Sequence, residues 1–170
     1  LRRRQRQMCI RDRLYSMEEG LGDSSELVTM LDDAIAGDPQ NIELWFSRAQ
    51  IFVSLEDYDE AIASLEKAIE LNPQSYEAQF FTGYYIIMKA DALNQEANEK
   101  EYTNAGEYEA DQKEILSIYS QAVPYLEVAH EIMPQNPYPV QLLKTLCYRL
   151  RDEPGMMEKY EKYNELYKQM

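Results

Sequence analysis

Few residues in this sequence belong to the types that catalyse reactions or bind metals, and their spacing favours neither role. The single histidine, His130, lies near the end of a predicted helix, where the helix dipole favours a surface imidazole. Cys147 falls at an inward helical position with no histidine nearby in the sequence, so we expect a buried structural thiol. The acidic run at residues 57–60 lacks the ligand spacing of a calcium-binding loop and is typical of a helix start. We therefore expect no catalytic site, no cofactor and no metal site.

The strongly negative charge of the chain argues against some classes of binding partner. It has 17 basic and 31 acidic residues, and the excess of acid lies in residues 14–136, which hold 5 basic and 25 acidic residues. Such a body repels polyanions, so nucleic acid and anionic lipid are poor partners. No apolar run approaches the roughly 18 residues of a membrane-spanning helix. We expect a soluble protein, and the sequence leaves the cytoplasm and the periplasm both open.

The first thirteen residues contrast with this acidic body, because six of them are arginines. A basic run of this kind would normally suggest a nucleic-acid-binding arm, and its apolar stretch is too short for a secretory signal. Residues 3–12, RRQRQMCIRD, resemble instead the translation of a transposase adapter used to prepare sequencing libraries, and Arg13 fits the next codon. We therefore expect residues 1–13 to be an artefact and the natural sequence to begin near Leu14, truncated upstream.

A helical pattern organises residues 42–75. Asn41 and Asp57 are placed to cap two helices, and Pro73 cannot continue the second one. In the second helix, small and apolar residues recur along one face at Ala61, Leu65, Ala68 and Leu71. Ala49 and Ala61 allow the two helices to approach closely. Because one helix pair cannot bury both its faces, further pairs must stack on it.

This unit resembles the tetratricopeptide repeat, a helix–turn–helix unit of about 34 residues. The positions that carry the resemblance are Trp45, Ala49, Phe52, Asp57, Tyr58, Ala61, Leu65, Ala68 and Pro73. Arg48 departs from it, since the family usually has Leu there. Similar units are a truncated repeat at 14–41, a repeat with an insertion at 76–136 and a C-terminal capping repeat at 137–170. The resemblance implies an all-α fold, a right-handed α-solenoid.

The insertion separates the two halves of the third unit by about 27 extra residues. Both flanks keep helical apolar stripes, and only residues near 99–108 have loop character. We expect helices from about residue 76 to the high 90s and from about 109 to 132, bent near Pro124, forming a projecting hairpin. Its apolar stripes should pack together, and it offers a second contact surface: Ile86, Ala90, Leu93, Ile115, Leu116 and Tyr119. The long first helix, the run ALNQEAN at residues 92–98 and the ending AVPYLEVAHEIMP at residues 122–134 also resemble tetratricopeptide proteins of Bacteroidetes bacteria.

The resemblance implies a binding groove lined by the first helix of each unit. The matching positions are Glu43, Phe46, Gln50, Val53, Glu77, Phe80, Tyr84, Ile87, Tyr138, Gln141, Thr145 and Tyr148. Aromatic rings there could anchor a partner segment, although Phe46 and Phe80 could equally support neighbouring helices. Some relatives bind C-terminal carboxylates through Lys, Arg and Asn in this groove. Here Arg149 alone is cationic, so that activity is not expected.

The sequence thus predicts a non-catalytic bacterial scaffold for protein–protein interaction. The alternative is a non-catalytic appendage of a larger enzyme or of a secretion or assembly protein whose other domains lie upstream. An enzyme in its own right is disfavoured, because no constellation of polar catalytic residues is present.

Overall fold

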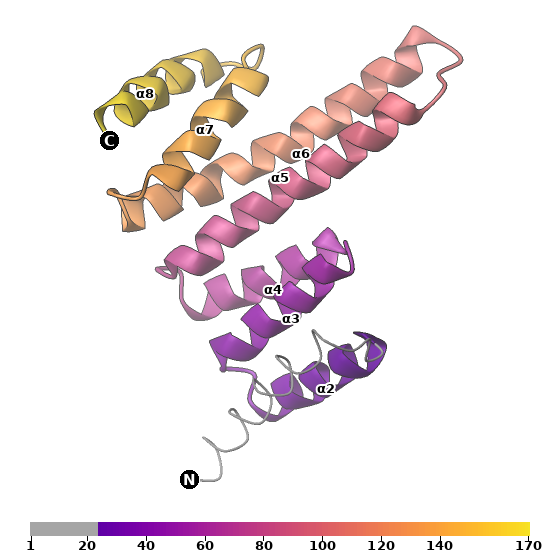
Figure 1. Ribbon diagram of the computed structural model, residues 1–170, viewed down its shortest axis with the longest axis vertical. Helices are drawn as coiled ribbons and strands as arrows, with labels where there is room; N and C mark the ends of the chain where they lie inside the picture. Colours follow the sequence, from indigo (N-terminus) through magenta and orange to yellow (C-terminus); the bar gives the residue numbers. More distant parts are fainter. Residues whose placement is uncertain (1–23) are drawn as a thin grey trace.

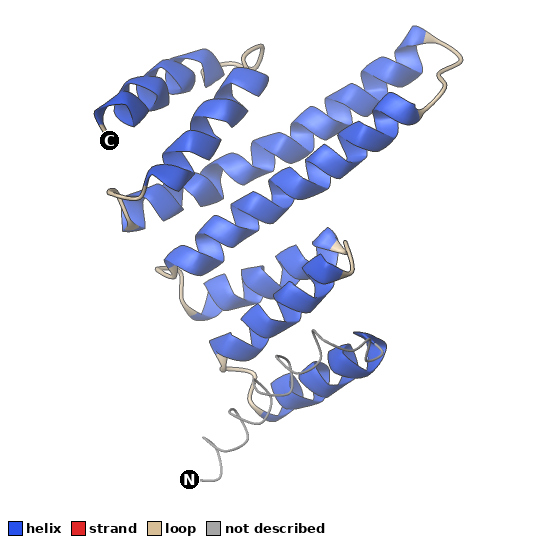
Figure 2. Cartoon of the chain, in the orientation of Figure 1, coloured by secondary structure: helices blue, strands red, loops and turns tan. Residues whose placement is uncertain are grey.

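The computed structural model describes residues 24–170, which form seven α-helices and no strand (Figures 1 and 2). The artefact assigned to residues 1–13 and the start of the natural sequence at Leu14 lie outside the described residues. The helices are α2 (Ser24–Gly37), α3 (Ile42–Ser54), α4 (Tyr58–Leu71), α5 (Tyr76–Glu99), α6 (Ala105–Ile132), α7 (Pro137–Arg149) and α8 (Met156–Gln169).

Side-chain caps begin most of these helices. The predicted caps are confirmed, because Asn41 accepts a hydrogen bond from the Glu43 amide and Asp57 accepts one from the Glu60 amide. Ser75 and Asn136 cap α5 and α7 in the same way. Each cap satisfies an N–H group that has no partner inside its own helix. The short polar linkers of this chain therefore set where each helix begins.

Each helix packs on the next one along the chain, so the helices form an elongated stack (Figure 1). Small side chains lie where paired helices meet, since Ala49, Ala61 and Ala68 are buried as predicted. At the crossing of α5 and α6, Gly83 lies so close to the partner helix that an added Cβ would be 2.8 Å from Cγ of Leu126. The predicted all-α solenoid architecture rests on these close crossings.

The insertion forms two long helices, as expected. α5 has 24 residues and α6 has 28, whereas α3 and α4 have 13 and 14, and the ends of α5 and α6 project as a hairpin (Figures 1 and 2). The six residues predicted to pack along the hairpin all belong to one apolar cluster. Pro124 lies inside α6 without ending it.

The predicted loop was too long. α6 begins at Ala105 rather than near 109, because Asn104 accepts a hydrogen bond from the Glu107 amide. The Glu107 carboxylate in turn accepts hydrogen bonds from the amide and hydroxyl of Thr103. This reciprocal arrangement fixes a helix start inside a segment that has loop composition.

Candidate protein-binding surface

The twelve positions predicted to line a groove lie on α3, α5 and α7, and none of them is fully buried. We call these twelve residues the first-helix surface. Seven of them are polar or tyrosine side chains with substantial exposure: Glu43, Gln50, Glu77, Tyr84, Tyr138, Gln141 and Tyr148. Phe46, Val53, Phe80 and Ile87 are half-buried, and Thr145 is exposed. Phe80 and Ile87 also pack against the main apolar cluster, so they support neighbouring helices as well as line the surface.

A row of stacked aromatic rings runs along the exposed side of α5. The Tyr76 and Phe80 ring centroids are 5.6 Å apart with planes 12° from parallel. The Phe80 and Tyr84 centroids are 6.2 Å apart with planes 6° from parallel. Tyr84 ends the row and is 38% exposed. Stacked rings of this kind form a rigid apolar platform that loses little conformational entropy when another chain binds.

A second aromatic pair widens this platform. Phe81 and Tyr85 stack with their centroids 5.8 Å apart, and Phe81 also meets Phe80 edge to face. Tyr85 is half-buried, and burial raises the pKa of its hydroxyl. The sequence prediction did not include Tyr76, Phe81 or Tyr85. The signal was present, since aromatic residues four apart on a helix lie next to one another.

Two polar contacts connect α5 with α7 and the residue that caps it. Near the start of α5, the Asn136 amide nitrogen donates a hydrogen bond of 2.8 Å to the Tyr76 hydroxyl. Further along, Arg149 Nη1 lies 2.8 Å from Asp91 Oδ1, and its guanidinium carbon lies 4.3 Å from the ring centroid of Tyr119. The Tyr119 hydroxyl also donates to Asp91. Arg149, the one cation that the sequence places in the groove region, is therefore already paired with a carboxylate of this chain.

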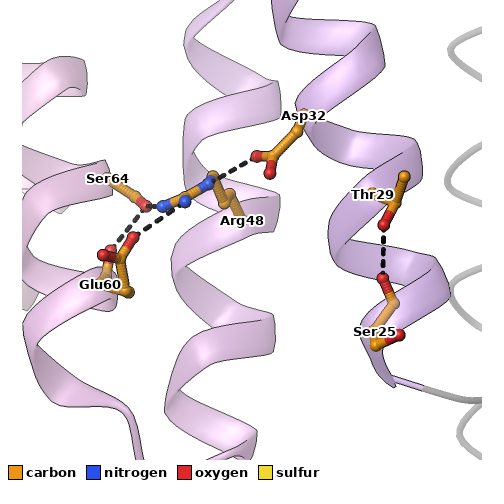
Figure 3. Close-up of polar contacts among 6 residues, drawn as sticks. All are labelled: Ser25, Thr29, Asp32, Arg48, Glu60 and Ser64. Atoms are coloured by element: carbon orange, nitrogen blue, oxygen red, sulfur yellow. Dashed lines mark hydrogen bonds and ion pairs between the residues drawn. The ribbon is translucent and has the colours of Figure 1, made fainter.

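Arg48, which stands where the family usually has Leu, joins three helices. Its side chain is only 16% exposed, and its Nε and Nη2 lie 2.9 Å from Asp32 of α2 and Glu60 of α4 (Figure 3). Nη1 donates a hydrogen bond of 2.7 Å to the Ser64 hydroxyl. Burial opposes the charge, but the hydrogen bonds to both carboxylates outweigh it and raise the pKa of the guanidinium. The guanidinium carbon also lies 4.5 Å from the Phe52 ring centroid, so the cation packs as part of the core.

Cys147 and His130, which the sequence singled out as possible catalytic residues, are both at least partly buried, so His130 is not the surface imidazole that was expected. Cys147 is buried, and that burial raises the pKa of its thiol to about 11, so the thiol stays protonated near neutral pH. His130 is in the last turn of α6, and its Nδ1 is buried without a hydrogen-bond partner among residues 24–170. Within residues 24–170, no three His, Cys, Asp or Glu side chains are arranged to hold a metal ion. No described helix is long and apolar enough to cross a bilayer.

A cleft of about 330 Å³ lies elsewhere, between α4 and the base of the hairpin. Its floor includes Ile62, Ile86 and Ile118. Four of its polar side chains are paired with one another, because Lys89 contacts Asp59 and the Tyr125 hydroxyl donates to Glu66 at 2.9 Å. Burial and that hydrogen bond raise the pKa of Tyr125 to about 12. The cleft contains none of the twelve residues of the first-helix surface.

Part of the chain is similar in sequence to proteins that contain tetratricopeptide repeats. Residues 42–75 match the family model of the tetratricopeptide repeat. Over 75 residues, 42% of this chain, the sequence is 35% identical to human "Tetratricopeptide repeat protein 28", of which the match covers 3%. Over 64 residues, 38% of this chain, it is 40% identical to "Protein SGT1 homolog" of Oryza sativa subsp. japonica, of which it covers 17%. The chain therefore matches only a small part of the length of these curated relatives.

A solved structure shares the arrangement of helices. "MamA MSR-1 C2" aligns with a TM-score of 0.55 at 18% sequence identity, over 87% of this chain and 70% of that chain. Together with the matched repeat, this likeness confirms the predicted fold class, an all-helical solenoid built from helix–turn–helix repeats.

Proposed function

We propose that the protein is a non-catalytic interaction scaffold that binds an extended segment of another protein on its first-helix surface. The observation that carries the proposal is the aromatic platform on α5. Tyr84 and Phe81 are more than a third exposed there, and α7 carries two further exposed tyrosines, Tyr138 and Tyr148. Clustered aromatic side chains at a protein surface are typical of the anchors that dominate binding energy. A matched tetratricopeptide repeat at residues 42–75 supports the same class of function.

The position of the platform favours an elongated ligand. Its aromatic rings follow the long axis of α5, and two polar contacts connect α5 with α7 and its cap, Asn136 with Tyr76 and Arg149 with Asp91. Polar side chains such as Gln141 and Gln50 lie exposed on the flanking helices and could contact a partner's backbone. An extended peptide can bury apolar side chains against the rings while its amides find such groups.

A second function fits the comparisons. The protein is then a non-catalytic repeat segment of a larger enzyme or of a secretion or assembly protein. This alternative is favoured by the matches to curated relatives, because the matched repeats are 3% and 17% of those proteins. Sequencing the gene from unfragmented genomic DNA decides between the two: a catalytic domain continuous with this chain favours the appendage, and its absence favours the scaffold.

The binding proposal can be tested with displayed peptides. The full chain is immobilised and panned with a random library of 12-residue peptides, and each enriched peptide is then measured on a Tyr84→Ala/Tyr138→Ala variant. Tyr108→Ala/Tyr167→Ala serves as the matched control, because these two tyrosines are also exposed and lie on α6 and α8. We expect enriched peptides that bind the control and lose binding to the first variant. Enrichment independent of Tyr84 and Tyr138 would overturn the proposal.

A further inference from the structure

We infer that the segment bound by the first-helix surface is cationic, with Lys or Arg side chains that meet the aromatic platform and the carboxylates beside it. This inference rests on the proposed function and names the chemistry of the partner.

The cations near the surface are already engaged within the chain. Arg48 is paired with Asp32 and Glu60, and Arg149 with Asp91. Arg151 lies with its guanidinium carbon 5.2 Å from the Tyr148 ring centroid and donates to the Tyr148 carbonyl. For Arg48 and Arg149, an anionic segment would have to compete with carboxylates that already lie within hydrogen-bond distance, whereas Arg151 is held against Tyr148. The surface therefore offers little to a partner's negative charge.

The carboxylates of the surface, in contrast, are not paired within the described part of the chain. Glu43 and Glu77 are exposed, and neither side chain has a hydrogen-bond or ion-pair partner among residues 24–170. Residues 24–136 hold 22 acidic and five basic side chains. Four of those five basic side chains are ion-paired inside the chain: Arg48, Lys67, Lys89 and Lys100. The unpaired charge left around the α3 and α5 parts of the surface is therefore negative, which attracts and orients a cationic partner there.

The aromatic platform adds a second reason. Elsewhere in the chain cations lie over aromatic faces, for example Lys144 at 4.4 Å from the Tyr167 ring centroid. Within residues 24–170, no cation lies over Phe80 or Tyr84. Exposed aromatic rings next to the unpaired Glu77 carboxylate on the same helix suit the flat guanidinium or the ammonium of a partner, because the rings attract cations and the carboxylate supplies a hydrogen-bond acceptor.

Charge-neutralising variants of the full chain test the inference. Glu43→Gln/Glu77→Gln removes the two surface charges, and Glu101→Gln/Glu109→Gln removes two exposed charges from the hairpin. The probes are the panned peptides whose binding depends on Tyr84 and Tyr138. Because Glu43 and Glu77 are also in the first turns of α3 and α5, where carboxylates stabilise helices, thermal unfolding is recorded for each variant.

We expect the enriched peptides to be rich in Lys and Arg. We expect the Glu43→Gln/Glu77→Gln variant to bind them about fivefold or more weakly, while the hairpin variant stays within about twofold of the unaltered chain. Neutral or acidic peptides that still depend on Tyr84 and Tyr138 would overturn the inference and leave the proposed function standing. Cationic peptides that bind both charge variants equally well would also overturn the inference. Peptides whose binding does not depend on Tyr84 and Tyr138 would overturn both the inference and the proposed function.

Discussion

Gly83→Ala probes the helix crossing on which the inserted repeat depends. The added Cβ would lie 2.8 Å from Cγ and 3.0 Å from Cδ2 of Leu126, and 3.2 Å from the carbonyl oxygen of Ala122. Leu126 and Ala122 are fully buried, so neither can move aside freely. Overpacking of this kind costs about 1–3 kcal/mol, whereas replacing Gly by Ala inside a helix gains about 1 kcal/mol. We expect a net loss of about 1 kcal/mol in the free energy of unfolding.

Urea unfolding followed by circular dichroism measures this loss. Gly37→Ala is the matched control, because a Cβ there meets nothing within 4 Å. The control should be as stable as the unaltered chain or up to about 1 kcal/mol more stable. The melting temperature of Gly83→Ala should fall by about 2–4 °C for a chain of this size.

A double-mutant cycle assigns the cost to Leu126. Leu126→Ala alone should cost about 2–5 kcal/mol, because it opens a cavity. In the Gly83→Ala background that cost should be smaller by about 1 kcal/mol or more, since the truncated side chain no longer meets the new methyl group. If Gly83→Ala is as stable as Gly37→Ala, the crossing of α5 and α6 has room for a Cβ at position 83. That result would refute the overpacking argument.

Three further outcomes follow from the packing. Ala68→Leu should lower the free energy of unfolding by about 1–3 kcal/mol, since Ala68 is buried where α4 meets its partner helix, and an unchanged melting temperature would remove it from that crossing. Cys147 should resist iodoacetamide in the native chain at pH 8 and react fully in guanidinium chloride, because burial raises the pKa of its thiol to about 11; rapid native labelling would contradict its burial. Deleting residues 90–117 and closing the turn should leave a helical chain that still unfolds cooperatively, because the crossing at Gly83 lies outside the deletion, and loss of the helical circular dichroism signal would show that the hairpin is needed for folding.

Much of the fold could be predicted from local patterns, because they report local physics. Asn41 and Asp57 cap helices in the structure as the sequence indicates, and the buried alanines follow the predicted face of α4. Within the insertion the apolar stripe predicted two long helices correctly. The start of α6 was wrong by about four residues, since the reciprocal contacts of Asn104, Thr103 and Glu107 overrode the loop composition around them.

The candidate surface was harder to predict, because its character depends on contacts between distant residues. The sequence places Arg149 on the first helix of the last unit. Its pairing with Asp91, 58 residues away, becomes visible only in the fold. Arg48 likewise departs from the family pattern, and its contacts with Asp32 and Glu60 explain the departure. The wider aromatic platform, including Phe81 and Tyr85, follows from helical spacing and could have been predicted.

The central claim is that the first-helix surface binds a peptide segment. Isothermal titration calorimetry with one selected 12-residue peptide tests this claim most directly, since it measures the dissociation constant for the full chain and for variants of that surface. The peptide is titrated into the unaltered chain, into Tyr84→Ala/Tyr138→Ala and into Tyr108→Ala/Tyr167→Ala, each with its fold checked by circular dichroism. Tyr84 and Tyr138 are 38% and 63% exposed, so truncating them should leave the core intact. We predict a dissociation constant about tenfold weaker for the Tyr84→Ala/Tyr138→Ala variant and within about twofold for the control. Equal dissociation constants for all three proteins would contradict the account.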